Sequence, residues 1–178
     1  MIEKIVFGGG CFWCVEAVVK QLRGVVSVTS GYTGGESEVP SYFAVSTGQT
    51  GHVEVVEVSF DGGVIKLEDL LAVFFSSHDP TSFDRQGNDV GSQYRSVIFF
   101  TSENQEDKIK KYIQKLEAEK IFSNKIVTEL KRLKNFFRAE EYHQDYYNQN
   151  REQPYCQYII DPKIVKLRKQ FAYLLKQE

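Results

Sequence analysis

The sequence predicts an α/β or α+β sandwich, in which a mixed sheet carries two main helices. The 178 residues include 42% hydrophobic and 26% charged residues, a composition that fits a folded globular chain and argues against disorder. Segments with the period of two expected of strands alternate with segments whose apolar residues recur every three or four positions, as in helices. No repeat, low-complexity tract or linker divides the chain, so we expect a single domain over residues 1–178.

The N-terminal segments predict two strands around a helix. Residues 2–7 read as a short strand, residues 8–10 as a glycine turn, and residues 11–22 as a helix with valines and a leucine on one side. The second strand is expected at residues 25–30. Gly, Ser, Thr and Pro then predict a loop over residues 31–51.

The middle of the chain predicts a strand, a helix and another strand. Alternation is clearest at residues 52–60. Leucine and phenylalanine spacing predicts an amphipathic helix that ends near Ser77, and a polar loop follows over residues 78–93. Residues 96–100 are apolar and rich in strand-forming types.

The C-terminal half predicts two longer helices and a segment without regular structure. Ser102 and Gln105 suggest a capping box at the start of one helix, and residues 126–130 suggest a further strand. A short helix is expected at residues 142–147. An irregular C-terminal stretch then contains Cys156, before a last helix begins at Pro162.

The charge balance and the cysteine count restrict the function classes. Lys and Arg total 22 against 24 Asp and Glu, a net charge of −2, without the basic tract that a nucleic-acid partner requires. The apolar runs are far shorter than the roughly 20 residues of a membrane span, and the N-terminus does not resemble a secretory signal, so we expect a cytoplasmic protein. Three cysteines are too few for a disulfide framework, which favours reduced thiols with a chemical role.

Cys11 is the strongest candidate for such a role. It follows three glycines and precedes a predicted helix, so its sulfur is expected beside the unpaired N–H groups of the first turn. That placement lowers the pKa of a thiol, and the glycines leave open space beside it. A buried, inert cysteine is the commoner alternative, but the position at a helix start favours a nucleophile.

Phe12 and Trp13 directly follow the sulfur. Packing in the core is their ordinary role, but beside a nucleophile they can wall a small apolar pocket of the kind that a methyl thioether fills. Cys11 and Cys14 also form a C-x-x-C pair, which is a redox signature. Nothing completes a zinc site around this pair, so we expect neither a metal nor an organic cofactor.

Glu54 is the candidate acid, and its orientation is open. Alternation places it on the same strand face as Val56, Val58 and Phe60. If that face is inward, loss of solvation favours the neutral acid and a proton donor; if it is reversed, the carboxylate is solvated. The loop at residues 84–94 is rich in hydrogen-bonding groups and suits a site wall, although an ordinary turn cluster is the alternative. Structural hydrogen bonding is the expected role of three scattered histidines: His52, His78 and His143.

The combination of motifs resembles one enzyme family, the peptide methionine sulfoxide reductases of the A type. The matching blocks cover nearly the whole chain: GGCFWCVE at 9–16, GYTGG at 31–35, TGHVE at 50–54, HDPT at 78–81, RQGND at 85–89, YRS at 94–96 and EYHQDY at 141–146. The resemblance implies a two-layer α/β sandwich with a ferredoxin-like core. It also implies thiol-dependent reduction of the S epimer of methionine sulfoxide, free or in proteins. The reaction would pass through a cysteine sulfenic acid and an intramolecular disulfide that thioredoxin reduces, as a form of protein repair under oxidative stress.

The resemblance also assigns roles to individual residues. Cys11 matches the nucleophile, and Glu54 matches the carboxyl that protonates the sulfoxide oxygen. Phe12 and Trp13 match the pocket that receives the substrate methyl group. Tyr42 and Tyr94 match the phenols that hydrogen-bond the sulfoxide oxygen, and Asp89 matches an acid that orders the site.

Cys14 departs from the commonest family pattern, which has Gly at that position. Cys156 lies where the family often places its recycling thiol, so two thiols compete to resolve the sulfenic acid. We favour Cys156, because a coil can bring its sulfur to Cys11 whereas Cys14 is fixed one turn along a helix. Direct resolution by Cys14, or its entry in a later exchange, remains open.

Two other function classes share some of these features. A general dithiol-disulfide oxidoreductase would have the same C-x-x-C context, and a non-catalytic module could bind oxidised peptides in the aromatic pocket. We rank both below a monomeric reductase whose partners are methionine sulfoxide and thioredoxin.

Overall fold

A six-stranded mixed sheet organises residues 1–177, the part of the chain that the computed structural model describes. Its strand order is β7-β6-β1-β3-β2-β8. All neighbours pair antiparallel except β6 and β7, which are parallel. The strands are β1 (Ile2–Gly8), β2 (Val25–Thr33), β3 (Val53–Asp61), β6 (Val97–Phe100), β7 (Glu129–Arg132) and β8 (Phe137–Arg138). The expected mixed sheet is therefore confirmed.

Two helical connections place the central strands. Helix α1 (Phe12–Val19) joins β1 to β2, and α3 (Leu67–Ser77) lies between β3 and β6 in the chain. In each case the two flanking strands are separated in the sheet by one other strand, β3 in the first case and β1 in the second. The end of β1 and the start of α1 consequently meet at one edge of the core, where Cys11 lies.

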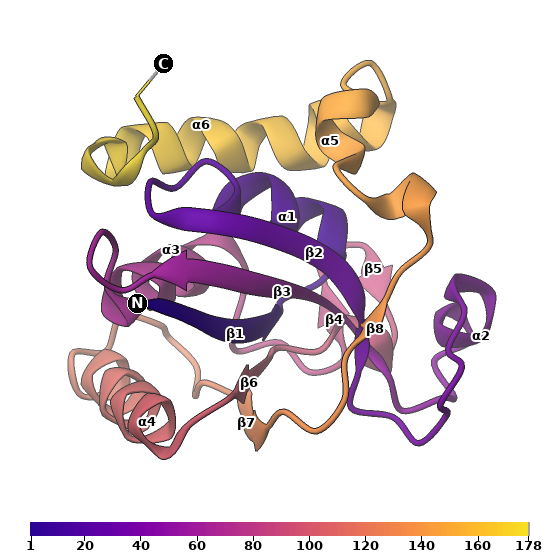
Figure 1. The fold of residues 1–178 in the computed structure, drawn as a ribbon, viewed down its shortest axis with the longest axis horizontal. Coiled ribbons are helices and arrows are strands. Elements are labelled where there is room, and N and C mark those ends of the chain that lie inside the picture. The colour runs from indigo at the N-terminus through magenta and orange to yellow at the C-terminus, as the bar shows by residue number, and fades with distance from the viewer. Residues whose placement is uncertain (178) are drawn as a thin grey trace.

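The helices gather on one face of the sheet (Figure 1). Helix α1 contacts β2 and β3 and also packs against α3 and α6 (Asp161–Gln170), while α4 (Glu103–Ala118) packs against α3 and β6. More helices therefore cover this face than the two expected. One large cluster of buried side chains fills the interface, and Phe7, Phe12, Phe60 and Phe74 are among its largest members.

The opposite face of the sheet has a smaller apolar cluster. Val6, Val53, Val55, Val97 and Phe99 are buried there, with Leu133 and Phe136 packed against them. Because both faces of β3 are covered, Glu54 cannot be exposed by a reversal of the strand.

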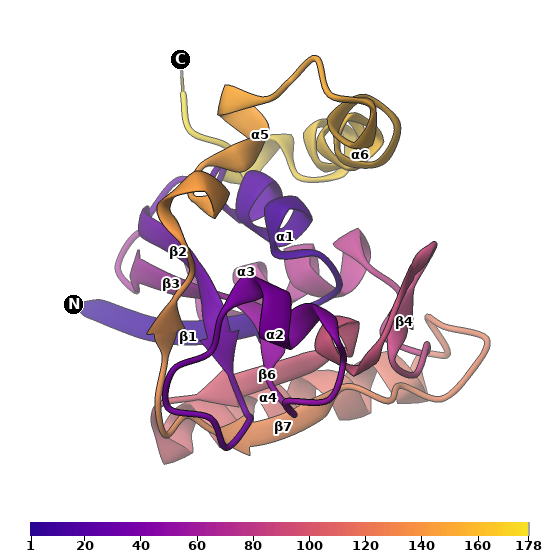
Figure 2. The ribbon, with the colours of Figure 1, turned by 90° about the vertical axis from the view of Figure 1, so that its right-hand side faces the viewer.

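Short elements lie at one end of the sheet, where Figure 2 shows α2 and β4. Residues 31–51, expected to be a loop, include the end of β2 and the five-residue helix α2 (Tyr42–Ser46), whose first turn is capped by Ser41 Oγ. The expected polar loop contains the hairpin β4 (Arg85–Gln86) and β5 (Asp89–Val90) and a 3₁₀ turn, η1 (Ser92–Tyr94). The segment after β8 forms the 3₁₀ turn η2 (Glu141–His143) and the helix α5 (Tyr146–Gln149), close to the expected short helix.

The expectation of an irregular stretch around Cys156 is wrong. Pro154 and Tyr155 are helical, η3 (Cys156–Ile160) is a π-helical turn, and α6 continues directly from it. Proline is compatible with the first turn of a helix because the N–H that it lacks would have no helical partner there. Cys156 therefore lies on a helix that packs against α1.

The other element boundaries differ by a few residues. Helix α1 ends at Val19 rather than at residue 22, and β7 begins at Glu129 rather than at residue 126. A last 3₁₀ turn, η4 (Ala172–Leu174), follows α6. Among the helices of residues 1–177, none combines the length and the apolar composition that a membrane span requires.

Candidate active site

Cys11 is the N-cap residue of α1 and follows a tight glycine turn. Gly10 has a φ of 92°, which side chains rarely adopt, and a Cβ there would approach Gln86 Cβ at 2.9 Å. The N–H of Cys14 donates to the Cys11 carbonyl at 3.1 Å, which closes the first turn. The glycine turn and the helix start therefore place the Cys11 sulfur as expected.

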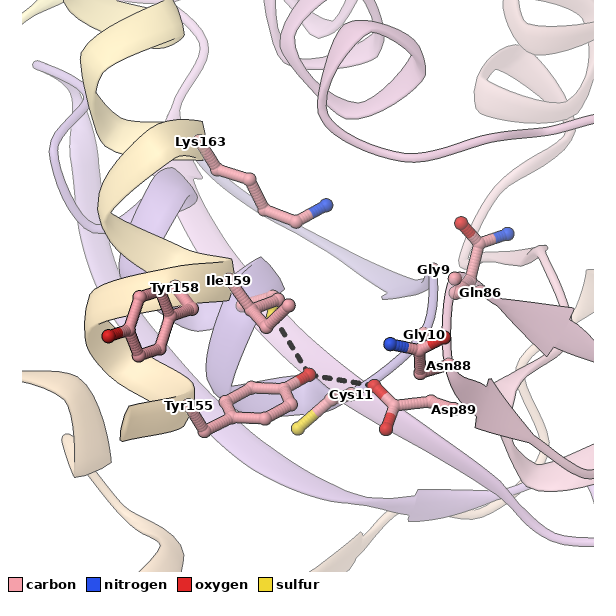
Figure 3. Close-up of a pocket in the computed structure, with 12 residues that line it drawn as sticks. Gly9, Gly10, Cys11, Gln86, Asn88, Asp89, Tyr155, Tyr158, Ile159 and Lys163 are labelled. Atoms are coloured by element: carbon pink, nitrogen blue, oxygen red, sulfur yellow. Dashed lines mark hydrogen bonds between the residues drawn. The ribbon is translucent and has the colours of Figure 1, made fainter. Parts of the chain in front are cut away.

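A pocket of about 400 Å³ reaches Cys11 from the side of α6 (Figure 3). The walls comprise the glycine turn, the β4–β5 hairpin and the π-helical turn with the start of α6, and include Cys11, Cys14, Asp89, Tyr155 and Lys163. Cys11 is 8% exposed, so a small part of it is accessible. Of residues 84–94, which are expected to form a site wall, residues 86–89 line this pocket.

The expectation of a lowered Cys11 pKa is wrong for this conformation. Burial raises the pKa of Cys11 well above its usual value, and the neighbouring Cys14 and the Glu54 charge raise it further. A backbone hydrogen bond at Trp13 lowers it, but less. A helix end contributes about 0.3–1 kcal/mol at an exposed position, whereas full burial can shift a pKa by up to 3–5 units. The loss of solvation therefore raises the pKa of Cys11 by more than the helix start lowers it.

Cys14 holds the negative charge of the thiol pair more readily. The Cys11 side chain as a hydrogen-bond partner lowers the pKa of Cys14 despite burial, and the Lys163 charge and Tyr155 lower it further. Cys14 Sγ lies 3.4 Å from the Tyr155 hydroxyl. Of these two neighbouring thiols, Cys11 therefore keeps its proton more firmly than Cys14 does.

Glu54 faces inward, which decides the alternative left open by its sequence. It is 2% exposed, and one carboxyl oxygen accepts a hydrogen bond of 3.2 Å from the backbone N–H of Phe12. Burial raises the pKa of Glu54 to about 8, although that hydrogen bond lowers it and the Asp89 charge raises it. At neutral pH Glu54 is therefore mostly a neutral acid beside the residue that follows Cys11.

Tyr42 and Tyr94 are half-buried near the same two groups. Burial raises the pKa of Tyr42 to about 12, with further effects from the charges of Glu54 and Cys11. The pKa of Tyr94 is raised by the same causes in the same order. Both phenols consequently keep their protons and are available as donors at neutral pH.

Asp89 lies in β5 and holds the hairpin against the C-terminal helix. The hydroxyl of Tyr155 donates to Asp89 Oδ2 at 2.7 Å (Figure 3). The same hydroxyl is the neighbour of Cys14 Sγ, so Tyr155 bridges the hairpin and α1. This arrangement agrees with an ordering role for Asp89.

Phe12 and Trp13 have different surroundings. Phe12 is fully buried and packs against Tyr32 and His143, with ring centroids 5.7 Å and 5.0 Å away. Trp13 is partly exposed and stacks on Tyr146, with 3.6 Å between ring centroids and 6° between planes. Neither ring borders the pocket beside Asp89. A methyl-binding role for these two rings stays a prediction.

Cys156 is fully buried, and no disulfide links it to the other two cysteines in residues 1–177. Burial raises the pKa of Cys156, and the charge of Cys14 raises it further. Cys14 is the thiol that raises the pKa of Cys11, whereas Cys156 lies on the π-helical turn η3. The physical reason for favouring Cys156 over Cys14, a mobile coil, is therefore removed.

Comparison with known proteins decides the family. The sequence model described as peptide methionine sulfoxide reductase matches residues 3–174. The chain belongs to this family. It is an oxidoreductase that reduces methionine sulfoxide.

Curated relatives agree along almost the whole reductase chain. It is 50% identical over 175 residues to the peptide methionine sulfoxide reductase MsrA of Chromobacterium violaceum, with 98% of this chain and 99% of the relative covered. It is 52% identical over 171 residues to the MsrA of Trichodesmium erythraeum, with coverage of 96% and 97%.

Solved structures show the same fold. Mxr1 of Saccharomyces cerevisiae in reduced form has a TM-score of 0.79 at 35% identity, with 87% of this chain and 89% of that chain covered. The same protein in complex with Trx2 has a TM-score of 0.56 at 27% identity, with coverage of 82% and 84%.

Several residues of this reductase that shape the site were not singled out from the sequence. The buried carboxyl of Glu16 accepts a hydrogen bond of 2.9 Å from the N–H of Asp145, which precedes Tyr146. A glutamate inside the apolar run of α1 was the available signal, since a buried carboxylate needs a partner. Tyr155 and Lys163 had no comparable sequence signal.

The expected structural role of the histidines is confirmed. His52 accepts a hydrogen bond from the N–H of Gly35, and His78 hydrogen-bonds the Phe74 carbonyl and Ser96 Oγ. The indole N–H of Trp13 donates to His143 Nδ1 at 3.1 Å.

Proposed function

We propose that this enzyme reduces the S epimer of methionine sulfoxide, free or in proteins, with Cys11 as nucleophile and Glu54 as acid. One observation carries the proposal: a buried carboxyl whose pKa is raised to about 8 is hydrogen-bonded to the residue next to a thiol that lines a pocket. A sulfoxide oxygen leaves readily only when it is protonated or hydrogen-bonded, so the reaction needs a neutral acid beside the attacking sulfur.

Each group has a defined part in the first step. Cys11 gives its proton to the Cys14 thiolate as its sulfur attacks the sulfoxide sulfur, and Glu54 gives its proton to the oxygen. Tyr42 and Tyr94 donate hydrogen bonds to that oxygen. Methionine leaves, the oxygen is transferred to Cys11 as a sulfenic acid, and the sulfoxide is reduced by two electrons while Cys11 is oxidised by two.

The second step forms a disulfide, and we assign Cys14 as the resolving thiol. Cys14 gives up the proton that it took in the first step and attacks as a thiolate. Its sulfur displaces the sulfenic oxygen of Cys11, so an S–S bond forms, an S–O bond breaks, and that proton leaves with the hydroxyl as water. This replaces our preference for Cys156, which lies on a helix rather than in a coil. Cys156 then attacks Cys14 of this disulfide, so a Cys14–Cys156 bond forms and Cys11 is released as a thiol; the π-helical turn that carries Cys156 packs against α1, which supports this exchange.

Regeneration is assigned to thioredoxin. The complex of Mxr1 with Trx2 supports this partner class at 27% identity. We infer in addition a monomer in the cytoplasm, formed as one domain over residues 1–178. The antiparallel order β6-β1-β3-β2 with its two helical connections supports a ferredoxin-like description of the core.

A single-turnover experiment with each sulfoxide epimer tests the proposal. The reduced enzyme without external reductant should form one methionine from the S epimer and none from the R epimer, and mass mapping should find a Cys11–Cys14 disulfide. Equal turnover of the R epimer would contradict the epimer assignment, and a Cys11–Cys156 bond with Cys14 free would contradict the resolving thiol. Reduction of insulin disulfides without sulfoxide turnover would favour a general dithiol oxidoreductase.

A further inference from the structure

Lys163 lies at the start of α6 and lines the same pocket as Cys11 and Cys14 (Figure 3). It is the one lysine or arginine among the residues described around this pocket. Its ammonium donates a hydrogen bond of 2.5 Å to the carbonyl of Ser77, at the C-terminal end of α3. That contact fixes a long, flexible side chain, so its positive charge has a defined place in the wall of the pocket that Cys14 also lines.

We propose that Lys163 is a positioning residue that favours the thiolate form of Cys14, which is the form that attacks the oxidised Cys11. This inference rests on the proposed function, because it assigns Cys14 as the resolving thiol. Lys163 does not touch the sulfoxide; it acts through Cys14.

The charged and titratable groups around Cys14 favour this role for Lys163. Lys163 is the only cation among the titratable groups that face Cys14 from the described elements packed against it. The others are neutral or become negative when they ionise: Cys11, Glu54, Asp89, Tyr155 and Cys156. Lys163 lowers the pKa of Cys14, whereas Asp89 raises it. A single cation in a partly buried pocket is less screened than one at the surface, so its removal has a measurable effect.

Lys166 provides a matched control one turn along the same helix. Its ammonium donates a hydrogen bond of 2.6 Å to the carbonyl of Ser76, next to the residue that Lys163 contacts. Both lysines therefore hold α6 against the end of α3, but Lys166 does not border the pocket with Cys14. If Lys163 had a purely structural role, replacing either lysine would affect the titration of Cys14 equally.

The experiment measures the Cys14 thiolate directly in the full chain. In a Cys11→Ser, Cys156→Ser background Cys14 is the only thiol, and its ultraviolet thiolate absorbance is titrated with Lys163→Met, Lys163→Arg or Lys166→Met added. We expect the titration midpoint to move to higher pH with Lys163→Met and to stay in place with Lys166→Met and Lys163→Arg. An unmoved midpoint in Lys163→Met, or an equal shift in Lys166→Met, overturns the proposal.

A kinetic measurement gives a second readout with all three thiols present. After one turnover, formation of the Cys11–Cys14 disulfide at neutral pH should be slower by roughly 3- to 10-fold in Lys163→Met, and the difference should vanish at high pH where Cys14 ionises without help. Thermal midpoints of both variants control for folding. If the unsubstituted enzyme forms no methionine, the proposed function is wrong; if it does and Lys163→Met forms the disulfide normally, only the role of Lys163 is wrong.

Discussion

The backbone N–H of Phe12 donates a hydrogen bond of 3.2 Å to the carboxyl of Glu54. This contact joins the central strand β3 to the first turn of α1, one residue after Cys11. The acid and the thiol are therefore held by a strand and a helix start that are joined directly by this hydrogen bond. The geometry of the pair depends on main-chain positions and not on long, mobile side chains.

Replacement of the acid tests its chemical role. Glu54→Gln keeps an oxygen that can accept from Phe12 but cannot protonate a sulfoxide. We expect kcat at pH 7 to fall by roughly 100-fold with KM changed little, since a positioned acid contributes about 10²–10⁴-fold. Steady-state kinetics with the S epimer measures this, and an unchanged kcat would remove the acid role.

The pH dependence of stability tests the raised pKa of Glu54 independently of activity. The pKa rises from 4.5 to about 8 in the folded protein. Between these values the folded state binds more protons than the unfolded chain, so this group's contribution is fully present below pH 4.5 and is lost as the pH rises through 8. Denaturant unfolding measures the free energy of unfolding of Glu54→Gln and of the unsubstituted protein at pH 5 and pH 9. Relative to the unsubstituted protein, Glu54→Gln should be more stable at pH 9 than it is at pH 5. A constant difference would contradict a raised pKa.

Removal of the nucleophile should abolish turnover. Cys11→Ser replaces the sulfur with an oxygen that is a far weaker nucleophile, and we expect a loss of roughly 1,000-fold or more. A dithiothreitol-coupled assay checks this without dependence on thioredoxin. Cys156→Ser is the comparison, because it should retain turnover with dithiothreitol. Activity in Cys11→Ser would show that another group attacks the sulfoxide.

The carboxyl of Glu16 should stabilise the fold. It is buried and accepts a hydrogen bond from the N–H of Asp145. Glu16→Ala therefore leaves that N–H without its partner and creates a cavity. We expect a loss of about 1–3 kcal/mol in the free energy of unfolding. Glu141→Ala, which removes an exposed carboxyl of the same segment, should cost less than about 1 kcal/mol. Equal effects would show that Glu16 does not anchor this segment.

Trp13 is the only tryptophan of the chain, so intrinsic fluorescence reports on the site. Its indole is hydrogen-bonded to His143 and stacked on Tyr146. Formation of a Cys11–Cys14 disulfide changes the helical turn that carries it, and we expect the emission to change once per turnover. Cys14→Ser should suppress that change while Cys156→Ser retains it. The reverse pattern would return the resolving role to Cys156.

The strands and the position of the acid followed closely from the sequence. The period of two at residues 52–60 placed Glu54 with apolar neighbours, and the packing of both faces of β3 removed the solvated alternative. The glycine turn before Cys11 was also read correctly, because a φ of 92° at Gly10 is accessible mainly to glycine.

The C-terminal wall and the state of the thiol could not be read in the same way. In the sequence Pro154 indicates an irregular stretch, but proline also fits the first turn of a helix, and that is where it lies. The helix start is a local feature of the sequence and predicts a low pKa for Cys11, whereas the burial that raises this pKa comes from segments distant in the chain. Tyr155 and Lys163 also reach the site from a segment that is distant in the chain, so the sequence around Cys11 does not reveal them.

A sulfur that stays protonated at rest has a further consequence for an enzyme of this kind. Hydrogen peroxide attacks thiolates far faster than thiols, and over-oxidation to the sulfinic acid is irreversible for most proteins. The burial that raises the pKa of Cys11 thus shields it from the oxidants that create its substrate, and keeps the catalyst intact until a sulfoxide enters.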